Sequence, residues 1–170
     1  MEDQGRLADP AGRRRDLAAM LQPVLRALIA AELPVLARHG ISMWGYSVLG
    51  ALEVSPAATQ AALAQGIRAD KTRIITTLDE LQRAGLITRA PDPADRRGRL
   101  LSITPAGKDV RWAVQAEIQS NEERVLTALP PADRQAFLRA AQALSALPPE
   151  AFAAPGEVST APGEASTAPG

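Results

Sequence analysis

The stretch that decides the fold is RAPDPADRRGRLLSITPAG, residues 89–107. It places the polar insert PDPADRRG between two apolar runs, LITRA (86–90) and RLLSI (99–103). Short apolar runs separated by a turn-rich connection predict two strands that pair as a hairpin. Three arginines lie in or beside the insert, so the tip of this hairpin carries a concentrated positive charge.

Two helices are expected immediately before the hairpin. Thr59 can cap a short helix, QAALAQG (60–66), and Asp70 can cap a longer one that extends through Gln82. The longer helix has a predicted buried stripe of Ile74, Ile75, Leu78 and Leu81. Asp79 is expected to pair with a nearby arginine. Two helices joined by a tight turn form a helix-turn-helix, and a following hairpin makes it a winged helix.

Further helices are expected on both sides of this unit. Apolar residues recur at helical spacing over 13–38, although Pro23 and Pro34 should kink or split that helix. Ser42 can cap a second helix, Thr104 and Pro105 open a long one to about residue 129, and a last helix covers about 132–147. The predicted fold class is therefore mainly α with a small β-hairpin.

Composition excludes several kinds of site. The chain has no cysteine and a single histidine, His39, which excludes disulfides, thiolate metal sites and multi-histidine zinc centres. It contains neither a plausible Ser/His/Asp set nor a phosphate-binding glycine loop, so we expect no enzyme, no metal and no cofactor. No apolar run reaches the roughly 20 residues of a membrane span, and the N-terminus lacks the apolar core of a signal peptide, which predicts a cytoplasmic protein.

Charge is balanced over the whole chain but not along it. The formal net charge is +0, yet residues 68–111 contain ten basic and six acidic side chains. A local positive field of this kind can meet a polyanion. The last residues repeat as APGEVST, APGEAST and APG, a composition with almost nothing to bury, so the tail is expected to be disordered.

These motifs together resemble the multiple-antibiotic-resistance regulator (MarR) family of bacterial transcription factors, over residues 13–147. The strongest match is DPADRRGRLLSITPAG (92–107), which is similar to the family's wing. LDELQRAGLITR (78–89) resembles the segment that joins the family's recognition helix to its wing. ISMWGYSVLGAL (41–52) and TQAALAQGI (59–67) resemble its second and third helices.

The resemblance implies a homodimer that binds double-stranded DNA and regulates transcription, most often as a repressor. Recognition helices would enter successive major grooves and wings the flanking minor grooves, so the operator should be pseudo-palindromic. The implied organisation is a flexible N-terminus (1–12), a dimerisation helix region (13–40), a winged helix-turn-helix (41–104), dimerisation helices (105–147) and the Pro/Gly/Ser/Thr tail (148–170).

The expected DNA contacts lie at the recognition helix and the wing. Arg73 is the expected base reader, because a guanidinium can hold guanine through two hydrogen bonds. Asp92 and Asp95 are expected to stabilise the wing by pairing with its arginines. The full set is Thr59, Lys71, Thr72, Arg73, Thr76, Thr77, Arg96, Arg97 and Arg99. The alternatives are that Thr59 only caps its helix and that the wing arginines form ordinary surface ion pairs.

Many members of the family sense small, often aromatic anions in the crevice between the dimer helices and the winged helix. Candidate lining residues here are His39, Met43, Trp44, Tyr46, Arg111 and Trp112. The alternative is core packing at a helix junction, and His39 also suits a helix end. The alternative function is a winged-helix module that binds another protein without specific DNA binding. A DNA titration over salt concentration separates the two functions.

Overall fold

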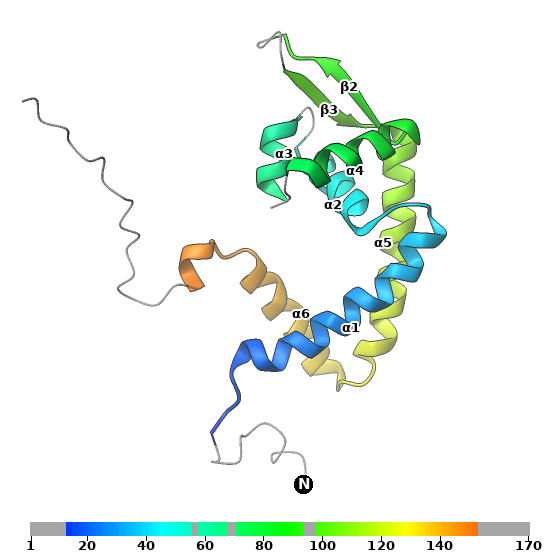
Figure 1. The fold of residues 1–170 in the computed structure, drawn as a ribbon. Helices are drawn as coiled ribbons and strands as arrows, with labels where there is room; N and C mark the ends of the chain where they lie inside the picture. Colours follow the sequence, from blue (N-terminus) through cyan, green and yellow to red (C-terminus); the bar gives the residue numbers. More distant parts are fainter. Residues whose placement is uncertain (1–12, 56–57, 68–70, 94–97, 153–170) are drawn as a thin grey trace, which may run out of the picture. The chain divides into compact units, whose positions relative to one another are not determined.

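The computed structural model describes residues 13–55, 58–67, 71–93 and 98–152, which form two compact units divided between Val125 and Leu126. Helices dominate both, as the sequence predicts (Figure 1). The first unit contains α1 (Leu17–Arg38), α2 (Met43–Val54), β1 (Ala58–Thr59), α3 (Gln60–Gly66), α4 (Lys71–Arg83), β2 (Ile87–Pro91), β3 (Arg99–Ile103) and α5 (Pro105–Leu126). The second contains α6 (Pro131–Ser145) and the short 3-10 helix η2 (Pro149–Phe152).

Helix starts follow the capping side chains that the sequence predicts. The hydroxyl oxygens of Ser42, Thr59 and Thr104 each accept a hydrogen bond from the backbone N–H three residues on, at 3.0, 3.2 and 3.0 Å. These bonds satisfy N–H groups that the first helical turn leaves unpaired, so α2, α3 and α5 begin at their predicted positions. Asp70, the expected cap of α4, lies outside the described residues.

The first helix is not split at its prolines. It runs for 22 residues with Pro23 and Pro34 inside it. Each proline removes only one backbone donor, and the neighbouring hydrogen bonds of the turn hold the helix together. Gly40, with φ of 67°, follows its C-terminus in the left-handed conformation that ends many helices.

The predicted hairpin is present, and one further strand joins it. The antiparallel sheet has the order β1-β3-β2, with Ile87 opposite Ile103 and Arg89 opposite Leu101. On the other side of β3, Ala58 of β1 lies opposite Leu101. Sequence reasoning missed β1 because two residues are too few to show an alternating pattern.

One apolar core supports the helix-turn-helix and the sheet. Among its buried side chains are Val48, Leu49 and Leu52 of α2, Ile74, Leu78 and Leu81 of α4, Ile87 and Leu101 of the sheet, and Val114 of α5. Each of the larger ones stabilises the fold by about 1.5–3 kcal/mol relative to an exposed side chain. The predicted stripe is wrong at Ile75, which is 40% exposed, whereas Thr77 is 5% exposed. At about 100° of rotation per residue, position 77 lies nearer the buried stripe than position 75.

A compact junction fixes the wing and α5 to the end of α4. Thr104 donates its hydroxyl to the Gly85 carbonyl oxygen at 2.8 Å and its N–H to the Leu86 carbonyl oxygen at 3.0 Å. Gly107 packs against the same backbone, where a Cβ would lie 2.1 Å from the Leu86 oxygen and 2.9 Å from Ile103 Cγ1. The glycine of the sequence motif is therefore needed for the close approach of α5 to the wing.

The second unit carries an exposed apolar face of its own. Phe137, Leu138 and Leu144 of α6 are 41–45% exposed. Residues 149–152 form η2, so the predicted disordered tail begins too early at residue 148. The remainder of that tail, like the predicted flexible segment 1–12, lies outside the described residues.

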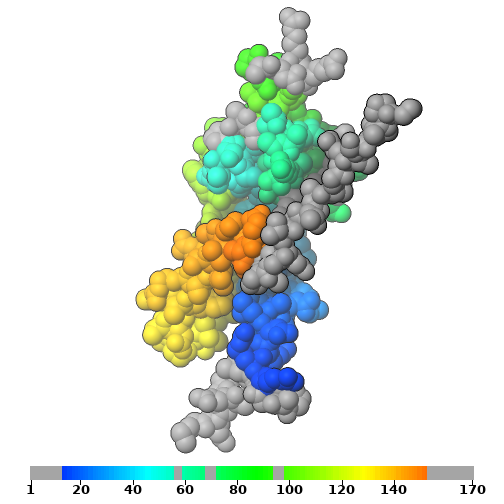
Figure 2. Space-filling view, turned by 90° about the vertical axis from the view of Figure 1, so that its left-hand side faces the viewer, coloured from blue at the N-terminus to red at the C-terminus, as the bar shows by residue number. Residues whose placement is uncertain are grey.

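Helix α1 also exposes apolar side chains along most of its length (blue in Figure 2). Its exposed side chains include Leu17, Leu21, Val24, Leu25, Ile29 and Leu33. With 22 residues and a mean hydropathy of 1.5, α1 has the length and composition of a membrane span, contrary to the sequence expectation. Arg26 and Glu32 interrupt the apolar run, but the mean hydropathy stays high enough for a membrane span. Only 11% of this stretch is buried by the residues that the structure describes, which therefore leave most of its apolar face uncovered.

Candidate nucleic-acid interface

The outer face of α4 presents polar side chains at the start of the predicted recognition helix. Thr72, Arg73 and Thr76 are exposed, while Ile74 and Leu78 anchor the opposite face in the core. Thr76 donates its hydroxyl to the Thr72 carbonyl oxygen at 3.3 Å. The Thr76 methyl group therefore remains available for apolar contact, as with a thymine methyl.

Three further residues of the helix-turn-helix are expected at this interface. Thr77 is only 5% exposed, so the prediction that it lies among the accessible contact residues is wrong. The backbone of Lys71 forms the first residue of α4, but its side chain lies outside the described part of the structure. Thr59, at the start of α3, is half-buried and accepts the capping bond, which still leaves its hydroxyl hydrogen able to donate to a ligand.

Trp44 contacts the recognition helix. The Arg73 Cζ atom lies 5.6 Å from the centroid of the Trp44 ring. Both residues, with Ser42, Thr72 and Thr76 among others, border a shallow surface hollow of about 380 Å³. Trp44 therefore lies beside a candidate DNA-contacting residue.

The wing is fixed to α4 by an ion pair between Arg89 of β2 and Asp79 of α4, with Nη2 and Oδ1 2.5 Å apart. This confirms the structural role predicted for Asp79. Figure 1 shows β2 and β3 extending from the end of α4. At the base of the wing loop, Asp92 donates its N–H to the Gly98 carbonyl oxygen at 3.2 Å, and Arg99 is exposed. Asp95, Arg96 and Arg97 lie outside the described residues.

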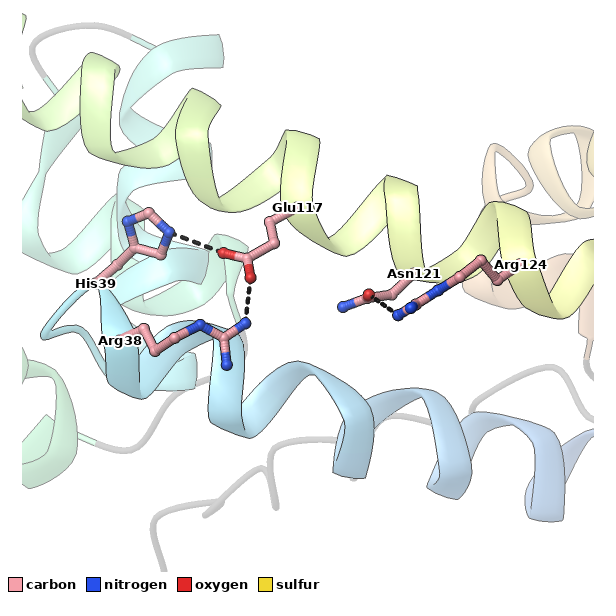
Figure 3. Close-up of polar contacts among 5 residues, drawn as sticks. All are labelled: Arg38, His39, Glu117, Asn121 and Arg124. Atoms are coloured by element: carbon pink, nitrogen blue, oxygen red, sulfur yellow. Dashed lines mark hydrogen bonds and ion pairs between the residues drawn. The ribbon is translucent and has the colours of Figure 1, made fainter.

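The C-terminal end of α1 is fixed to α5 through Glu117. Arg38 forms an ion pair with Glu117, and His39 Nε2 lies 3.2 Å from Glu117 Oε2 (Figure 3). Hydrogen bonds from Arg38 and then His39 hold the pKa of Glu117 below its ordinary value. These hydrogen bonds therefore stabilise the folded protein above the pKa that Glu117 has in the unfolded chain. That stabilisation is lost as the pH falls through the lower pKa of Glu117 in the folded protein. His39 thus has the helix-end role that the sequence also suggests.

A second polar cluster joins α2 to α5. Trp112 Nε1 donates to Glu53 Oε1 at 2.8 Å, and Arg111 forms an ion pair with the same carboxylate. Burial raises the pKa of Tyr46, an effect that Arg111 opposes. Met43 and Tyr46 pack against the core. The six candidate ligand residues are therefore distributed over several contacts instead of lining one crevice.

An open groove between α1 and α5 is lined by other residues. Its volume is about 390 Å³, and its walls include Leu28, Ala31 and Glu32 of α1 and Ile118, Glu122 and Val125 of α5. Burial raises the pKa of Glu32, and the neighbouring charge of Glu122 raises it further. Sequence reasoning missed this pair of carboxylates, because nothing in the sequence indicates that residues 32 and 122 face each other.

Glu32→Gln is expected to stabilise the protein at pH 7 by about 0.5 kcal/mol, since it removes a repelling charge from a half-buried position. The pKa of Glu32 is higher in the folded protein than in the unfolded chain, so ionised Glu32 destabilises the fold. This destabilisation is absent below the ordinary pKa of 4.5 and complete above the folded pKa. Thermal unfolding at several pH values should show a gain that disappears below pH 4.5. Glu123→Gln, on the exposed side of α5, is the control, and an equal gain from it would contradict the assignment.

Comparison with known proteins agrees with this architecture. A model of the MarR family matches residues 39–98, from the end of α1 to the wing. Over these residues the chain is similar to the MarR family. The predicted resemblance and the mainly α fold with a wing are thereby confirmed.

Solved structures and a curated relative show the same similarity. RV1404 from Mycobacterium tuberculosis is 26% identical with a TM-score of 0.67, and the match covers 76% of this chain and 89% of that one. The apo form of MarR from Escherichia coli shares the fold at 20% identity, with a TM-score of 0.68 over 78% of this chain and 98% of that one. A protein of Thauera aromatica, named as a transcriptional regulatory protein for the hcr operon, is 27% identical over 96 residues, 56% of this chain. The matched region spans only 58% of that relative's length.

Proposed function

We propose that this chain is a member of the MarR family, a cytoplasmic transcriptional repressor that binds a pseudo-palindromic operator as a homodimer and has no catalytic activity. The observation that carries the proposal is the outer face of α4, where Thr72, Arg73 and Thr76 are exposed beside a wing. A helix held by its apolar face and polar on the other can enter the major groove, which is roughly 12 Å wide.

Each contact residue has a proposed role. Arg73 reads a base edge, and Thr72 and Thr76 contact thymine methyls or phosphates. Thr59, Lys71 and Arg99 contact phosphates. Arg96 and Arg97, in the loop between β2 and β3, reach phosphates or the adjacent minor groove, where the negative potential is high. Asp92 and Asp95 stabilise the loop that carries them.

A second copy of this chain is the proposed partner of the exposed apolar faces. Six apolar side chains of α1 are 39–58% exposed, and α6 exposes three more. Exposed apolar faces of this kind are typical of a permanent interface. Two copies related by a twofold axis would present two recognition helices, which a pseudo-palindromic operator requires.

The test combines DNA selection with a salt titration. Fragments of the source genome that the purified protein retains should share a pseudo-palindromic sequence. Affinity for that sequence should exceed affinity for random duplex by 10³-fold or more and fall steeply with salt. Sedimentation should give a dimer. A strictly monomeric protein that binds no duplex at low salt would overturn the proposal and favour a protein-binding winged helix.

Arg73→Ala is expected to relax base preference at one position in each half-site. A guanidinium held to guanine by two hydrogen bonds contributes roughly 1–3 kcal/mol of discrimination, or about 5- to 150-fold. Affinities for operators substituted one base pair at a time will reveal that position. Arg83→Ala removes the same charge from the last turn of α4 and is the matched control. A uniform loss across all sequences in Arg73→Ala would show that Arg73 contacts only phosphate.

Release by a small aromatic molecule belongs to the same proposal. The groove between α1 and α5 offers about 390 Å³ with apolar walls. Tyr46 is close enough for Glu32 and Glu122 to act on its pKa. Two carboxylates disfavour an anion in this groove, so a neutral aromatic compound is the proposed effector, in place of the anion that the family resemblance implies. Release of bound operator DNA by such a compound, lost in a Leu28→Trp variant that fills the groove, is the test.

A further inference from the structure

We propose that Trp44 is a positioning residue for Arg73, holding its guanidinium in place on the DNA-facing side of α4 before DNA arrives. This inference rests on the proposed function, because it assigns a cause to the orientation of the base-reading side chain. Trp44 itself need not touch DNA. It acts through the contact in which the Arg73 Cζ atom lies 5.6 Å from the centroid of the indole ring.

The fold brings Trp44 to this position through a close approach of α2 to α4. Gly45, the next residue, is buried, and a Cβ there would lie 3.4 Å from Leu81 Cδ2. Ser42 caps α2 at this point by accepting the Gly45 N–H at 3.0 Å. Trp44 therefore extends from a helix start that is fixed both by its cap and by packing against α4. A half-buried indole on such a base is a rigid platform.

A guanidinium can stack on an aromatic ring and donate hydrogen bonds to a base at the same time. A cation within about 6 Å of a ring centroid is attracted by the negative face of the ring. The N–H donors of arginine lie in the plane of the guanidinium, so stacking on a ring uses its face and not the edge that binds guanine O6 and N7. Arginine loses considerable rotamer freedom when it is immobilised, so fixing it beforehand removes part of that loss from the binding step.

The experiment is a double-mutant cycle on the intact protein, using the operator identified above. Trp44→Ala is expected to weaken operator binding by about two- to fivefold, the range of an exposed cation–π contact. It should also lower discrimination at the base pair that Arg73→Ala affects, with an unchanged salt slope, since no phosphate contact is lost. In the Arg73→Ala background the same substitution should have no further effect. In the Arg83→Ala background, Trp44→Ala should again weaken operator binding by the full two- to fivefold.

The outcomes separate this inference from the proposed function. A Trp44→Ala loss that persists in the Arg73→Ala background overturns the inference, as does a gain in affinity, which would mean that Trp44 sequesters Arg73. If Arg73→Ala loses discrimination and Trp44→Ala keeps it, only the inference fails. If the wild-type protein does not discriminate operator from random duplex, both fail. Trp44→Phe keeps an aromatic ring with a weaker attraction for cations and should lie between wild type and Trp44→Ala, which keeps the test valid should the alanine variant unfold.

Discussion

Replacing Gly107 with alanine is expected to lower the free energy of unfolding by at least about 2 kcal/mol. The new Cβ would lie 2.1 Å from the Leu86 carbonyl oxygen, a backbone atom that cannot rotate away. Alanine in a helix gains up to about 1 kcal/mol over glycine, but that gain is smaller than the cost of moving α5 from the wing. The melting temperature should fall by about 4–8 °C.

Gly66→Ala is the matched control for this prediction. Gly66 is the last residue of α3, and a Cβ there would meet nothing within 4 Å. Its substitution should therefore be neutral or slightly stabilising. Chemical denaturation of both variants gives the comparison. Equal stability of Gly107→Ala and the wild-type protein would show that α5 does not approach the Leu86 backbone as closely as described.

The joint change Arg96→Ala and Arg97→Ala is expected to weaken binding to every duplex, by about 100-fold or more at low salt. In a homodimer the pair occurs twice, so up to four phosphate contacts are lost. The slope of log affinity against log salt concentration should then decrease in magnitude by about two to four. Preference between operator and random duplex should change far less, because the proposed contacts are to phosphates or the minor groove, which carry little sequence information.

A variant with equal charge change tests whether position matters. Arg13→Ala with Arg14→Ala removes two exposed arginines that precede α1 and lie outside the winged helix. In titrations at four or more salt concentrations, the slope of log affinity against log salt concentration for this variant should lie within about one of the wild-type slope. If both double variants change the slope equally, the wing makes no local contact and the effect is one of net charge alone.

Local signals in the sequence determined most of the elements of this protein. Ser42, Thr59 and Thr104 have side chains that satisfy the first turn of a helix, so the starts of α2, α3 and α5 were predictable from a few neighbouring residues. The hairpin was predictable for the same reason, since its register follows from two apolar runs and a short connection. The family was recognisable because these local patterns occur in a fixed order.

Only the tertiary structure decided which distant residues meet. Asp79 with Arg89, Glu117 with His39, and Trp44 with Arg73 each join separate elements, and their pairing depends on how helices pack. The exposure of Ile75 and the burial of Thr77 were likewise decided by where the core lies around α4. Local patterns depend on interactions a few residues apart, which sequence spacing records directly. Pairings between elements depend on packing angles and helix rotation, which no single stretch of sequence contains.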